Sequence, residues 1–342
     1  MSNIITSKIK IIYYDTKWEV QHRKFAKKYF NNRRRHIDPK YLFWKYRGPE
    51  NKSSCTLLLA TYNDKVIGQL GVIICQILMN AERYDACFIC SLMLDNIYRG
   101  NGIAQLLYNK VLEEYDLVFG SNPNPIAWKS EKRFGFKKIM GPSQLFFPFY
   151  FSAITEKKIK LLTKILGWLP NPILLSKKNR GLNFDLDKYK INYHQINYDM
   201  LNKIAFKDKI YPNHNESYIK WRTEEFSTYQ SKSHIFQKNN DFLVFLRYSG
   251  NVGFIEKIVY SNFQIIMKVV LSIIKKMQKR KVKEIKFLTC DEKLISYLKQ
   301  VGFIKFRRSI EIIYCTNNKK FKNLINENTI FEYSLLDSDE NI

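Results

Sequence analysis

A repeated order of elements constrains the fold of this 342-residue chain more than any other feature of its sequence. In both halves, extended segments are followed by a long helix, a short strand, a second helix and a last strand. Tyr41-Leu-Phe-Trp44 resembles Tyr218-Ile-Lys-Trp221, and the helix end before Gly135 resembles the one before Gly302, at nearly the same separation. Chance similarity of helix ends is the alternative. The repeat predicts two related domains, which the length also favours.

Apolar periodicity and turn residues give the bounds of the expected elements. In the first half, strands are predicted at 8–14, 55–62, 65–77, 84–94, 116–120 and 136–151, and helices at 18–29, 38–46, 101–114 and 125–134. In the second half, strands are predicted at 235–237, 242–248, 251–260, 284–289 and 303–314, and helices at 263–280 and 292–300.

A basic amphipathic segment lies between the two halves. It follows the aromatic run at 145–151 and combines lysines with leucine, isoleucine and tryptophan up to Trp168. Such a segment could contact an anionic membrane surface through residues 146–175, or pack on the protein as an interdomain helix. The expected domains are therefore 1–150, a connecting segment at 151–185, a second domain at 186–335 and an acidic tail at 336–342.

The charge and the hydropathy exclude several classes of protein. The 57 basic and 31 acidic side chains give a net charge of +26, which favours a polyanionic partner, although a lysine-rich composition alone gives the same excess. Nucleic acid is not the expected partner, because no nucleic-acid motif accompanies the charge. No apolar run is long enough to span a membrane, and the first residues do not form a secretory signal. We expect a cytoplasmic protein, peripheral at the inner membrane face if the connecting segment binds lipid.

The six cysteines include one Cys-x-x-Cys pair, Cys87 and Cys90, inside a predicted strand. Residues three apart on a strand face opposite sides of the sheet, so the pair is not expected to share a metal ion or a disulfide. The sequence therefore predicts free thiols and no metal site.

The stretch from Leu92 to Ala104 carries the clearest chemical signal. A predicted strand ends, a short turn follows, and a loop with Gly100 and Gly102 opens a helix. The first N–H groups of a helix have no partner within it and favour an anion, and glycines let the backbone approach phosphate oxygens closely. Arg99 adds a positive charge. This loop is expected to bind a pyrophosphate.

At these residues the sequence resembles the GNAT superfamily of N-acyltransferases. Arg99, Gly102 and Ala104 match the acyl-CoA signature of that family, which is Arg or Gln, any two residues, Gly, any residue, then Gly or Ala. The resemblance covers residues 1 to about 150. It implies an α/β fold in which each of two tandem domains has a mixed, mostly antiparallel twisted sheet flanked by helices. A second pattern of the family is matched by Asn124, Ala127, Gly135 and Phe136.

The second half is similar to the degenerate half of tandem GNAT proteins. Tyr260-Ser-Asn-Phe-Gln contains no glycine-rich loop, and Asp291 and Leu298 stand where the first half has Asn124 and Glu131. We expect this domain to keep the fold without the donor site and to help shape the acceptor cleft.

The resemblance implies roles for particular residues. Glu131 holds the place of the family's tyrosine acid, so that Glu131 and Asn124 are the candidate catalytic residues, and a solvated helix residue is the alternative interpretation of Glu131. A backbone N–H at Met93 or Leu94 is expected to hold the thioester carbonyl. The residues expected to bind the donor, acetyl-CoA or another acyl-CoA, are Met93, Leu94, Arg99, Gly100, Asn101, Gly102, Ile103, Ala104 and Asn124.

The acceptor site is expected just after the second helix. Trp44, Tyr46 and Arg47 combine aromatic faces with a cation, which suits a sugar that carries phosphate or carboxylate. Core packing of Trp44 is an equally acceptable interpretation. The general base is not identified by the sequence. The candidates are Asp85, Asp95 and His36, each of which also has an ordinary structural interpretation.

The stretch that contains Trp44, Tyr46 and Arg47, together with the tandem layout, is similar to GNAT proteins of bacterial surface-polysaccharide synthesis. The leading hypothesis is therefore acyl transfer from acyl-CoA to the amine of a small acceptor, an amino sugar, in some cases nucleotide-linked. One alternative is acyl or aminoacyl transfer to a peptide or a lipid-linked cell-wall precursor. Another is a non-catalytic binding module derived from the GNAT fold.

Overall fold

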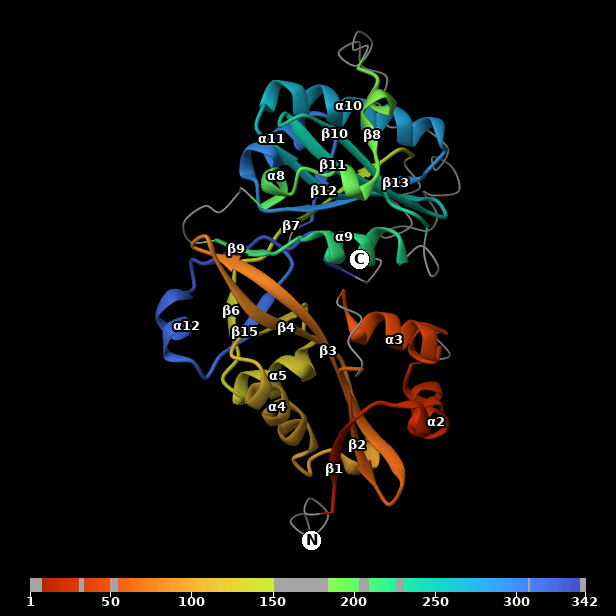
Figure 1. Ribbon diagram of the computed structural model, residues 1–342, viewed down its shortest axis with the longest axis vertical. Coiled ribbons are helices and arrows are strands. Elements are labelled where there is room, and N and C mark those ends of the chain that lie inside the picture. Colours follow the sequence, from red (N-terminus) through yellow and green to blue (C-terminus); the bar gives the residue numbers. More distant parts are fainter. Residues whose placement is uncertain are drawn as a thin grey trace, which may run out of the picture. The chain divides into compact units, whose positions relative to one another are not determined.

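The computed structural model describes residues 8–30, 34–49, 55–150, 184–202, 209–225, 231–306 and 308–338. The chain divides into two compact units (Figure 1). Unit 1 comprises Met1–Met140, Ala205–Asn213 and Glu311–Phe331, and unit 2 comprises Gly141–Ile204, His214–Ile310 and Glu332–Ile342. Each unit therefore contains segments from both halves of the sequence.

The sheet of unit 1 has the order β1-β2-β3-β4-β5-β15-β6, and β9 adds to β3 while β16 adds to β9. All neighbours along the main path are antiparallel except β4 and β5. The strands are β1 (Lys10–Tyr13), β2 (Leu57–Tyr62), β3 (Lys65–Met79), β4 (Glu82–Leu94), β5 (Val118–Ser121), β6 (Lys137–Ile139), β9 (Lys209–Pro212), β15 (Ile312–Cys315) and β16 (Ile330–Phe331).

Helices cover both faces of this sheet (Figure 1). On one face lie α4 (Ile103–Glu114) and α5 (Pro125–Arg133), and on the other lie α2 (Glu19–Tyr29) and α3 (Pro39–Arg47). Asn124 and Asp38 each accept a backbone N–H at the start of a helix whose first residue is proline, which explains where α5 and α3 begin. The short elements of unit 1 are η1 (Thr16–Trp18), η2 (Arg34–His36), η3 (Asn96–Tyr98) and α12 (Lys319–Leu324).

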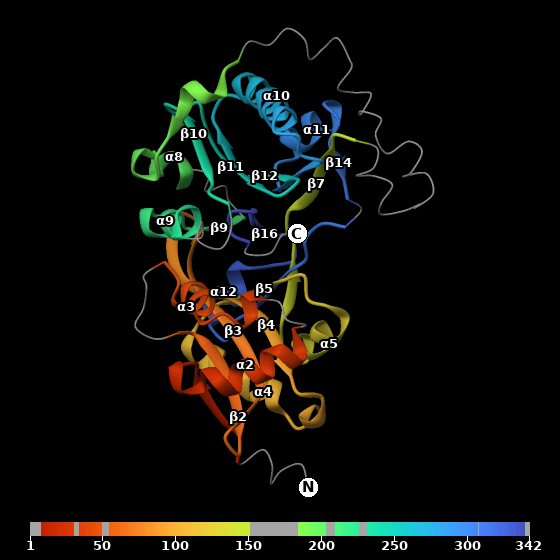
Figure 2. The ribbon, with the colours of Figure 1, turned by 90° about the vertical axis from the view of Figure 1, so that its right-hand side faces the viewer.

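The sheet of unit 2 has the order β14-β7-β13-β12-β11-β10-β8. The long helix α10 (Phe263–Lys279) buries an apolar stripe in the core, and α11 (Glu292–Gln300) packs in the same cluster (Figure 2). The other elements are β7 (Ser143–Pro148), η6 (Leu186–Tyr189), β8 (Lys190–Ile191), η7 (Tyr193–Gln195), α8 (Tyr198–Asn202), α9 (Glu216–Thr223), β10 (His234–Lys238), β11 (Phe242–Ser249), β12 (Val252–Tyr260), β13 (Glu284–Thr289) and β14 (Ile304–Lys305).

The two sheets have the same sequence of strand directions. From β1 or from β8, three antiparallel pairings are followed by one parallel pairing and two more antiparallel ones. In each unit a helix joins the two parallel strands, as α4 joins β4 to β5 and α10 joins β12 to β13. The predicted fold class, an α/β fold with mixed, mostly antiparallel sheets flanked by helices, is confirmed.

The two predicted strands at 136–151 and 303–314 are both broken, which corrects the sequence analysis. The first becomes β6 in unit 1 and β7 in unit 2, separated by Gly141-Pro142, and Pro142 cannot donate a backbone hydrogen bond to a sheet. The second becomes β14 in unit 2 and β15 in unit 1. The units thus exchange strands, because β7 lies between β13 and β14 while β15 lies between β5 and β6. The observed boundaries therefore differ from the contiguous domains that were expected.

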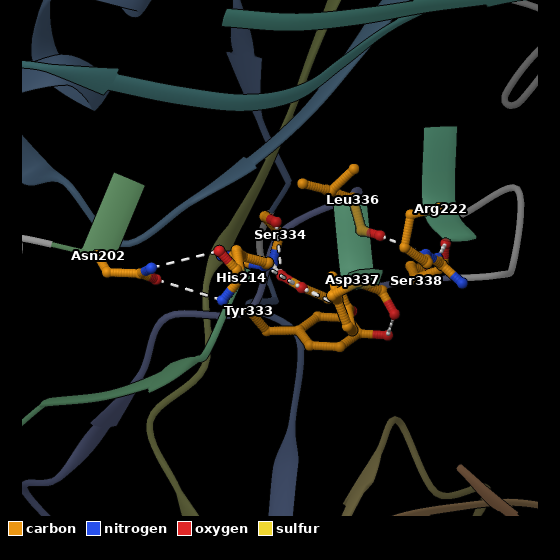
Figure 3. Close-up of polar contacts among 9 residues, drawn as sticks. Asn202, His214, Arg222, Tyr333, Ser334, Leu336, Asp337 and Ser338 are labelled. Carbon is orange, nitrogen blue, oxygen red and sulfur yellow. Dashed lines mark hydrogen bonds and ion pairs between the residues drawn. The ribbon is translucent and has the colours of Figure 1, made fainter. Parts of the chain in front are cut away.

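Part of the expected acidic tail is buried in unit 2 (Figure 3). The Asp337 carboxylate lies 2.7 Å from the buried His214 Nε2, and the Leu336 carbonyl accepts from the Arg222 guanidinium at 2.6 Å. Burial acts to raise the pKa of Asp337, but His214 holds it well below its usual range. These contacts hold residues 336–338 in unit 2. A buried carboxylate such as that of Asp337 is stable only when it has partners of this kind.

The membrane prediction rested on residues 146–175, of which 151–183 lie outside the described residues. The preceding aromatic residues are described and do not face a lipid surface. Phe146, Phe147 and Phe149 are buried, since Phe147 and Phe149 pack in the core cluster of unit 2 and Phe146 packs against Phe306. Within the described ranges, every helix is too short or too polar to cross a bilayer.

The cysteine prediction is confirmed for the strand that carries the Cys-x-x-Cys pair. Cys87 packs in the cluster beneath α4, whereas Cys90 contacts the cluster beneath α2 and α3, so that the two thiols lie on opposite faces of β4. The six cysteines, all of which lie among the described residues, form no disulfide.

Candidate active site

The loop between β4 and α4 is shaped by its own backbone contacts. Asp95 accepts the N–H of Ile97 at 3.2 Å and so begins η3 immediately after the strand ends. Gly100 and Gly102 follow with φ angles of 85° and 72°, in the left-handed region that favours glycine. The loop therefore turns sharply into the helix without the steric cost that a Cβ would bring.

The N-terminus of α4 has no side-chain cap. Gly102 occupies the cap position and offers no side chain, and the first helical bond is the one from the Leu106 N–H to the Gly102 carbonyl at 3.1 Å. A Cβ at Gly102 would meet nothing within 4 Å, so the space in front of the helix is open. N–H groups that begin a helix without a cap form an anion site, strengthened by the helix dipole.

A cavity of about 620 Å³ opens beside this helix N-terminus. Its walls come from the end of β4, the glycine loop, the first turn of α4 and one face of α5. Two arginines and no acidic residues are among the described residues of the lining. The lining residues are Leu92, Met93, Leu94, Arg99, Gly100, Gly102, Ile103, Ala104, Gln105, Asn124, Ile126, Ala127, Ser130, Arg133 and Phe134.

Eight of the nine residues expected to bind the donor lie in this lining. The exception is Asn101, whose amide instead donates to the Tyr98 carbonyl at 3.1 Å and stabilises the loop. Asn124 lines the cavity and also begins α5, because its amide oxygen accepts the N–H groups of Ile126 and Ala127 at 3.0 and 2.9 Å. The amide NH2 of Asn124 is not used by this cap.

Glu131 lies behind the cavity wall rather than in it. The side chain is 6% exposed, and one carboxyl oxygen accepts from the Tyr108 hydroxyl at 3.2 Å. The other oxygen has no hydrogen-bond partner among the described residues. Burial raises the pKa of Glu131 to about 7, and the Tyr108 hydrogen bond opposes this rise. The Tyr108 ring lies 4.9 Å from that of Phe134, a wall residue, so the carboxyl is one side chain away from the cavity.

The three residues expected to bind the acceptor do not lie together at the surface. Tyr46 is 1% exposed and packs against Gly71, where an added Cβ would approach the tyrosine ring to 2.5 Å. Tyr46 is therefore a core residue, which corrects its assignment to the acceptor. Trp44 and Arg47 are half-buried on the same helix, and the Arg47 guanidinium lies 4.4 Å above the Phe43 ring.

The three candidate bases lie outside the cavity lining. Asp95 begins η3 and pairs with Lys28 at 3.1 Å. Burial acts to raise the pKa of Asp95, but the Tyr29, Ile97 and Lys28 contacts hold it below its ordinary value. Asp85 accepts from Gln76 at 3.1 Å, and the His36 ring stacks on Phe30 at 4.1 Å. Asp95 therefore has the turn role that was its alternative interpretation, whereas Asp85 lies within β4 and His36 is not an isolated surface residue.

Seven lining residues were not among those expected to bind the donor: Leu92, Gln105, Ile126, Ala127, Ser130, Arg133 and Phe134. Gln105 follows the signature directly, and Ile126, Ser130 and Arg133 lie on α5 at intervals of four and three residues. That spacing places the three side chains on one face of a helix. The helical periodicity could have found them once Asn124 was taken as the start of the helix.

Residues 20–124 match the model of the acetyltransferase (GNAT) family. This segment runs from α2 to the start of α5 and contains the whole glycine loop. This part of the chain is therefore similar to the GNAT acetyltransferases. A search of the curated proteins finds no match.

Solved structures resemble both units at low sequence identity. A GCN5-related N-acetyltransferase from Anabaena variabilis superposes with a TM-score of 0.61 at 10% identity, covering 91% of this chain and 73% of that chain. A putative acetyltransferase from Pyrococcus horikoshii gives 0.55 at 10%, covering 97% and 96%. N-myristoyltransferase from Saccharomyces cerevisiae with bound myristoyl-CoA gives 0.52 at 9%, covering 90% and 82%. At these identities the likeness describes the fold.

Proposed function

We propose that unit 1 transfers an acyl group from acyl-CoA to the amine of a small acceptor. The observation that carries this proposal is the uncapped N-terminus of α4, preceded by two left-handed glycines and open to the 620 Å³ cavity. In the reaction the thioester C–S bond breaks and a C–N bond forms. The amine loses a proton and the departing thiolate takes one up.

The chemistry of the cavity suits acyl-CoA as donor. The helix N–H groups together with Arg99 and Arg133 favour the phosphates, because they combine a helix dipole with two permanent cations. Leu92, Ile103 and Phe134 supply apolar wall for the uncharged arm of the donor. The myristoyl-CoA bound by the yeast neighbour leads us to include long acyl chains with acetyl as candidates.

The backbone at the end of β4 offers one N–H for the thioester carbonyl. Met93 lies directly opposite Gln69, and the Asp95 N–H donates to the Ile67 carbonyl at 2.8 Å. N–H groups alternate sides along a strand, so the intervening Leu94 N–H points away from β3, on the side of β5. Pairing between β4 and β5 ends at Ile89 and Gly120. We therefore propose that the N–H of Leu94, rather than that of Met93, donates to the thioester carbonyl.

Glu131 is our candidate for the general acid that protonates the departing thiolate. A carboxyl with a pKa of about 7 is protonated in about half of the molecules at neutral pH, which suits a general acid. Its unpartnered oxygen is a buried group that a functional role would explain. The assignment requires the side chain to turn from Tyr108 toward the cavity when the donor binds. Asn124 is assigned to donor binding through its amide NH2.

We propose an amino sugar as the acceptor, nucleotide-linked in some cases, used in surface-polysaccharide synthesis. Trp44 and Arg47 support this class, because an aromatic face and a guanidinium suit a sugar that bears an anionic group. Unit 2 supports the tandem arrangement, since it repeats the strand directions of unit 1. We propose that unit 2 is degenerate and binds no donor. Contact of residues 151–175 with the inner membrane face is proposed from the sequence alone.

Substitution of Gly102 tests the donor site. Gly102→Glu introduces a carboxylate where we place the phosphates, and we expect the affinity for acetyl-CoA in titration calorimetry to fall at least about 10-fold. Gly250→Glu is the matched control, because Gly250 also has a positive φ, 55°, and open space around it, but lies in the turn between β11 and β12 of unit 2. Undiminished binding in Gly102→Glu, or equal losses in both variants, would contradict the site.

The acceptor is tested with a panel of amines. Acetyl-CoA and myristoyl-CoA are each offered with nucleotide amino sugars, free amino sugars, a peptide with a free N-terminus and a lipid-linked precursor, and thiol release is followed. We expect the nucleotide amino sugars to give the highest kcat/KM. Turnover with the peptide or the lipid-linked precursor alone would replace the acceptor class, and donor binding without turnover on any amine would favour a binding module.

A further inference from the structure

Strand β4 contains a bulge close to the end that lines the cavity. Gln69 pairs with Met93, but Gly71 pairs with Cys90, so two steps along β3 are matched by three steps along β4. Ser91, one of the two residues between these pairs, has a φ of 53°, which a side-chain-bearing residue rarely adopts. One residue more on β4 than on β3 defines a bulge in a strand that is otherwise regular.

This bulge decides which backbone groups face the cavity. Backbone N–H groups point alternately to the two sides of a strand. One added residue reverses the side on which the N–H group of every later residue points. Without it, the Leu94 N–H would turn toward β3 instead of toward the side of β5. The donor-facing N–H of the proposed reaction therefore depends on the bulge staying in place at Ser91.

Two buried polar side chains hold the bulge. The Gln69 amide nitrogen donates to the Ser91 carbonyl at 3.3 Å, and the Gln69 amide oxygen lies 2.9 Å from His22 Nε2. An amide oxygen only accepts, so His22 donates from Nε2. Burial lowers the pKa of His22, which keeps the ring neutral with its proton on Nε2. Gln69 and His22 are each 1% exposed.

We propose that His22 and Gln69 are positioning residues for acyl transfer. They hold the Ser91 carbonyl and so fix the bulge that directs the Leu94 N–H toward the donor carbonyl, a role that rests on the proposed function of unit 1. His22 orients the Gln69 amide, and Gln69 binds the Ser91 carbonyl in the bulge. The bulge in turn fixes the direction of the Leu94 N–H. Neither side chain lines the cavity, so both act through the strand.

The corresponding bulge in unit 2 supports a functional reason for the pair. There the register between β11 and β12 also shifts by one residue, and the residue before the shift is Phe245 where unit 1 has Gln69. Phe245 is fully buried and apolar. The bulge residue Glu256 is held instead by Arg247 at 2.7 Å and by the Leu336 N–H at 3.2 Å. A bulge in this fold can therefore form around a buried phenylalanine, and the amide–imidazole pair belongs to the unit with the open helix N-terminus.

Gln69→Leu separates positioning from folding. This variant removes both hydrogen bonds at similar volume, and we expect kcat to fall about 100-fold while KM and the calorimetric affinity for acetyl-CoA change less than about 3-fold, because the phosphate loop is untouched. The infrared band of the bound carbonyl in ¹³C-labelled acetyl-CoA should move to the position found in water. A folded variant with unchanged kcat and band position would overturn the proposal, as would a parallel loss of affinity and kcat.

His22 provides the independent variants, in case Gln69→Leu does not fold. The amide introduced by His22→Gln can still donate an N–H to the Gln69 oxygen, so this variant should keep kcat within about 5-fold of the wild type, whereas His22→Leu should behave like Gln69→Leu. Equal kcat values in the two His22 variants would overturn the proposal. A wild-type protein that binds no acyl-CoA would instead remove the proposed function itself, before any of these variants is compared.

Discussion

The two helix N-termini that follow the parallel strands β4 and β12 differ in whether a side chain accepts from their first N–H groups. In unit 1, α4 begins after Gly102 without a side-chain cap. In unit 2, α10 begins after Asn262, whose side chain accepts the N–H groups of Gln264 and Ile265 at 3.0 and 3.3 Å. The N–H groups that lack a side-chain acceptor in unit 1 are thus partly satisfied by a side chain in unit 2.

The space beyond the helix differs in the same direction. Near the start of α10, Tyr260 donates to Asp291 at 2.6 Å, and the Phe263 ring lies 6.0 Å from the Tyr297 ring. These side chains join the ends of β12, α10 and α11, whereas the corresponding elements of unit 1 border a cavity. Two sheets of the same topology therefore have different surroundings at the helix N-terminus, through one capping residue and a few side chains.

Separating the two units should have the largest effect. A fragment of residues 1–150, the first domain expected from the sequence, lacks β9, β15 and β16 and carries β7 without its neighbours. We expect no cooperative thermal transition, because β15 lies between β5 and β6 and its loss leaves two unpaired edges. Circular dichroism during heating is the measurement.

Co-expression of residues 1–140 with 141–342 is the control for that fragment, and the two pieces should copurify and bind acyl-CoA. A folded, monomeric 1–150 fragment with full affinity for acyl-CoA would show that the exchange of strands is not needed for unit 1.

Glu131 should have the next largest effect, because it is buried beside the cavity at the start of α4. In Glu131→Gln we expect kcat to fall about 100-fold, with loss of the decline in rate above pH 7. Glu113→Gln, an exposed substitution on α4, is the matched control. Full turnover in Glu131→Gln would remove this residue from the mechanism.

The same variant has an expected effect on stability. The pKa of Glu131 is raised from 4.5 to about 7, so its contribution is present below pH 4.5 and is lost as the pH rises through about 7. Relative to the wild type, Glu131→Gln should gain on the order of 3 kcal/mol between pH 4 and pH 8, an upper value for full burial. Urea unfolding at both pH values measures this. Parallel pH dependence in the two proteins would contradict it.

Two capping asparagines give the smallest and most direct comparison. Asn124→Ala and Asn262→Ala each remove the acceptor of two helix N–H groups, and each should cost about 1 kcal/mol in the free energy of unfolding. Asn124→Ala should also weaken acyl-CoA binding, because Asn124 lines the cavity. Asn262→Ala should leave binding unchanged. Equal effects of the two variants on affinity would contradict the difference between the units.

Local patterns were sufficient to predict most of the fold. The glycine loop, the capped starts of α3 and α5 and the long apolar stripe of α10 depend on neighbouring residues, so the sequence displays them directly. The exchange of β7 and β15 was not predictable in this way. A strand pattern reports which side chains are buried, but it does not identify the neighbouring strand.

The site was predictable to the same extent. The loop and Asn124 follow from a motif, whereas the burial of Tyr46 depends on its packing against Gly71, a residue on a separate strand. His22 and Gln69 left only a faint signal, a histidine on the apolar face of a helix and one of two glutamines in an apolar strand. Their significance depends on the bulge at Ser91, which no local pattern reveals.

We assign one donor site to a chain with two similar sheets, and the stoichiometry of acyl-CoA binding distinguishes this assignment from two sites per chain. Titration calorimetry of the full chain with acetyl-CoA should give one site per chain, which Gly102→Glu removes and Asn262→Ala leaves intact. Two sites per chain, or one site that survives Gly102→Glu, would contradict the account.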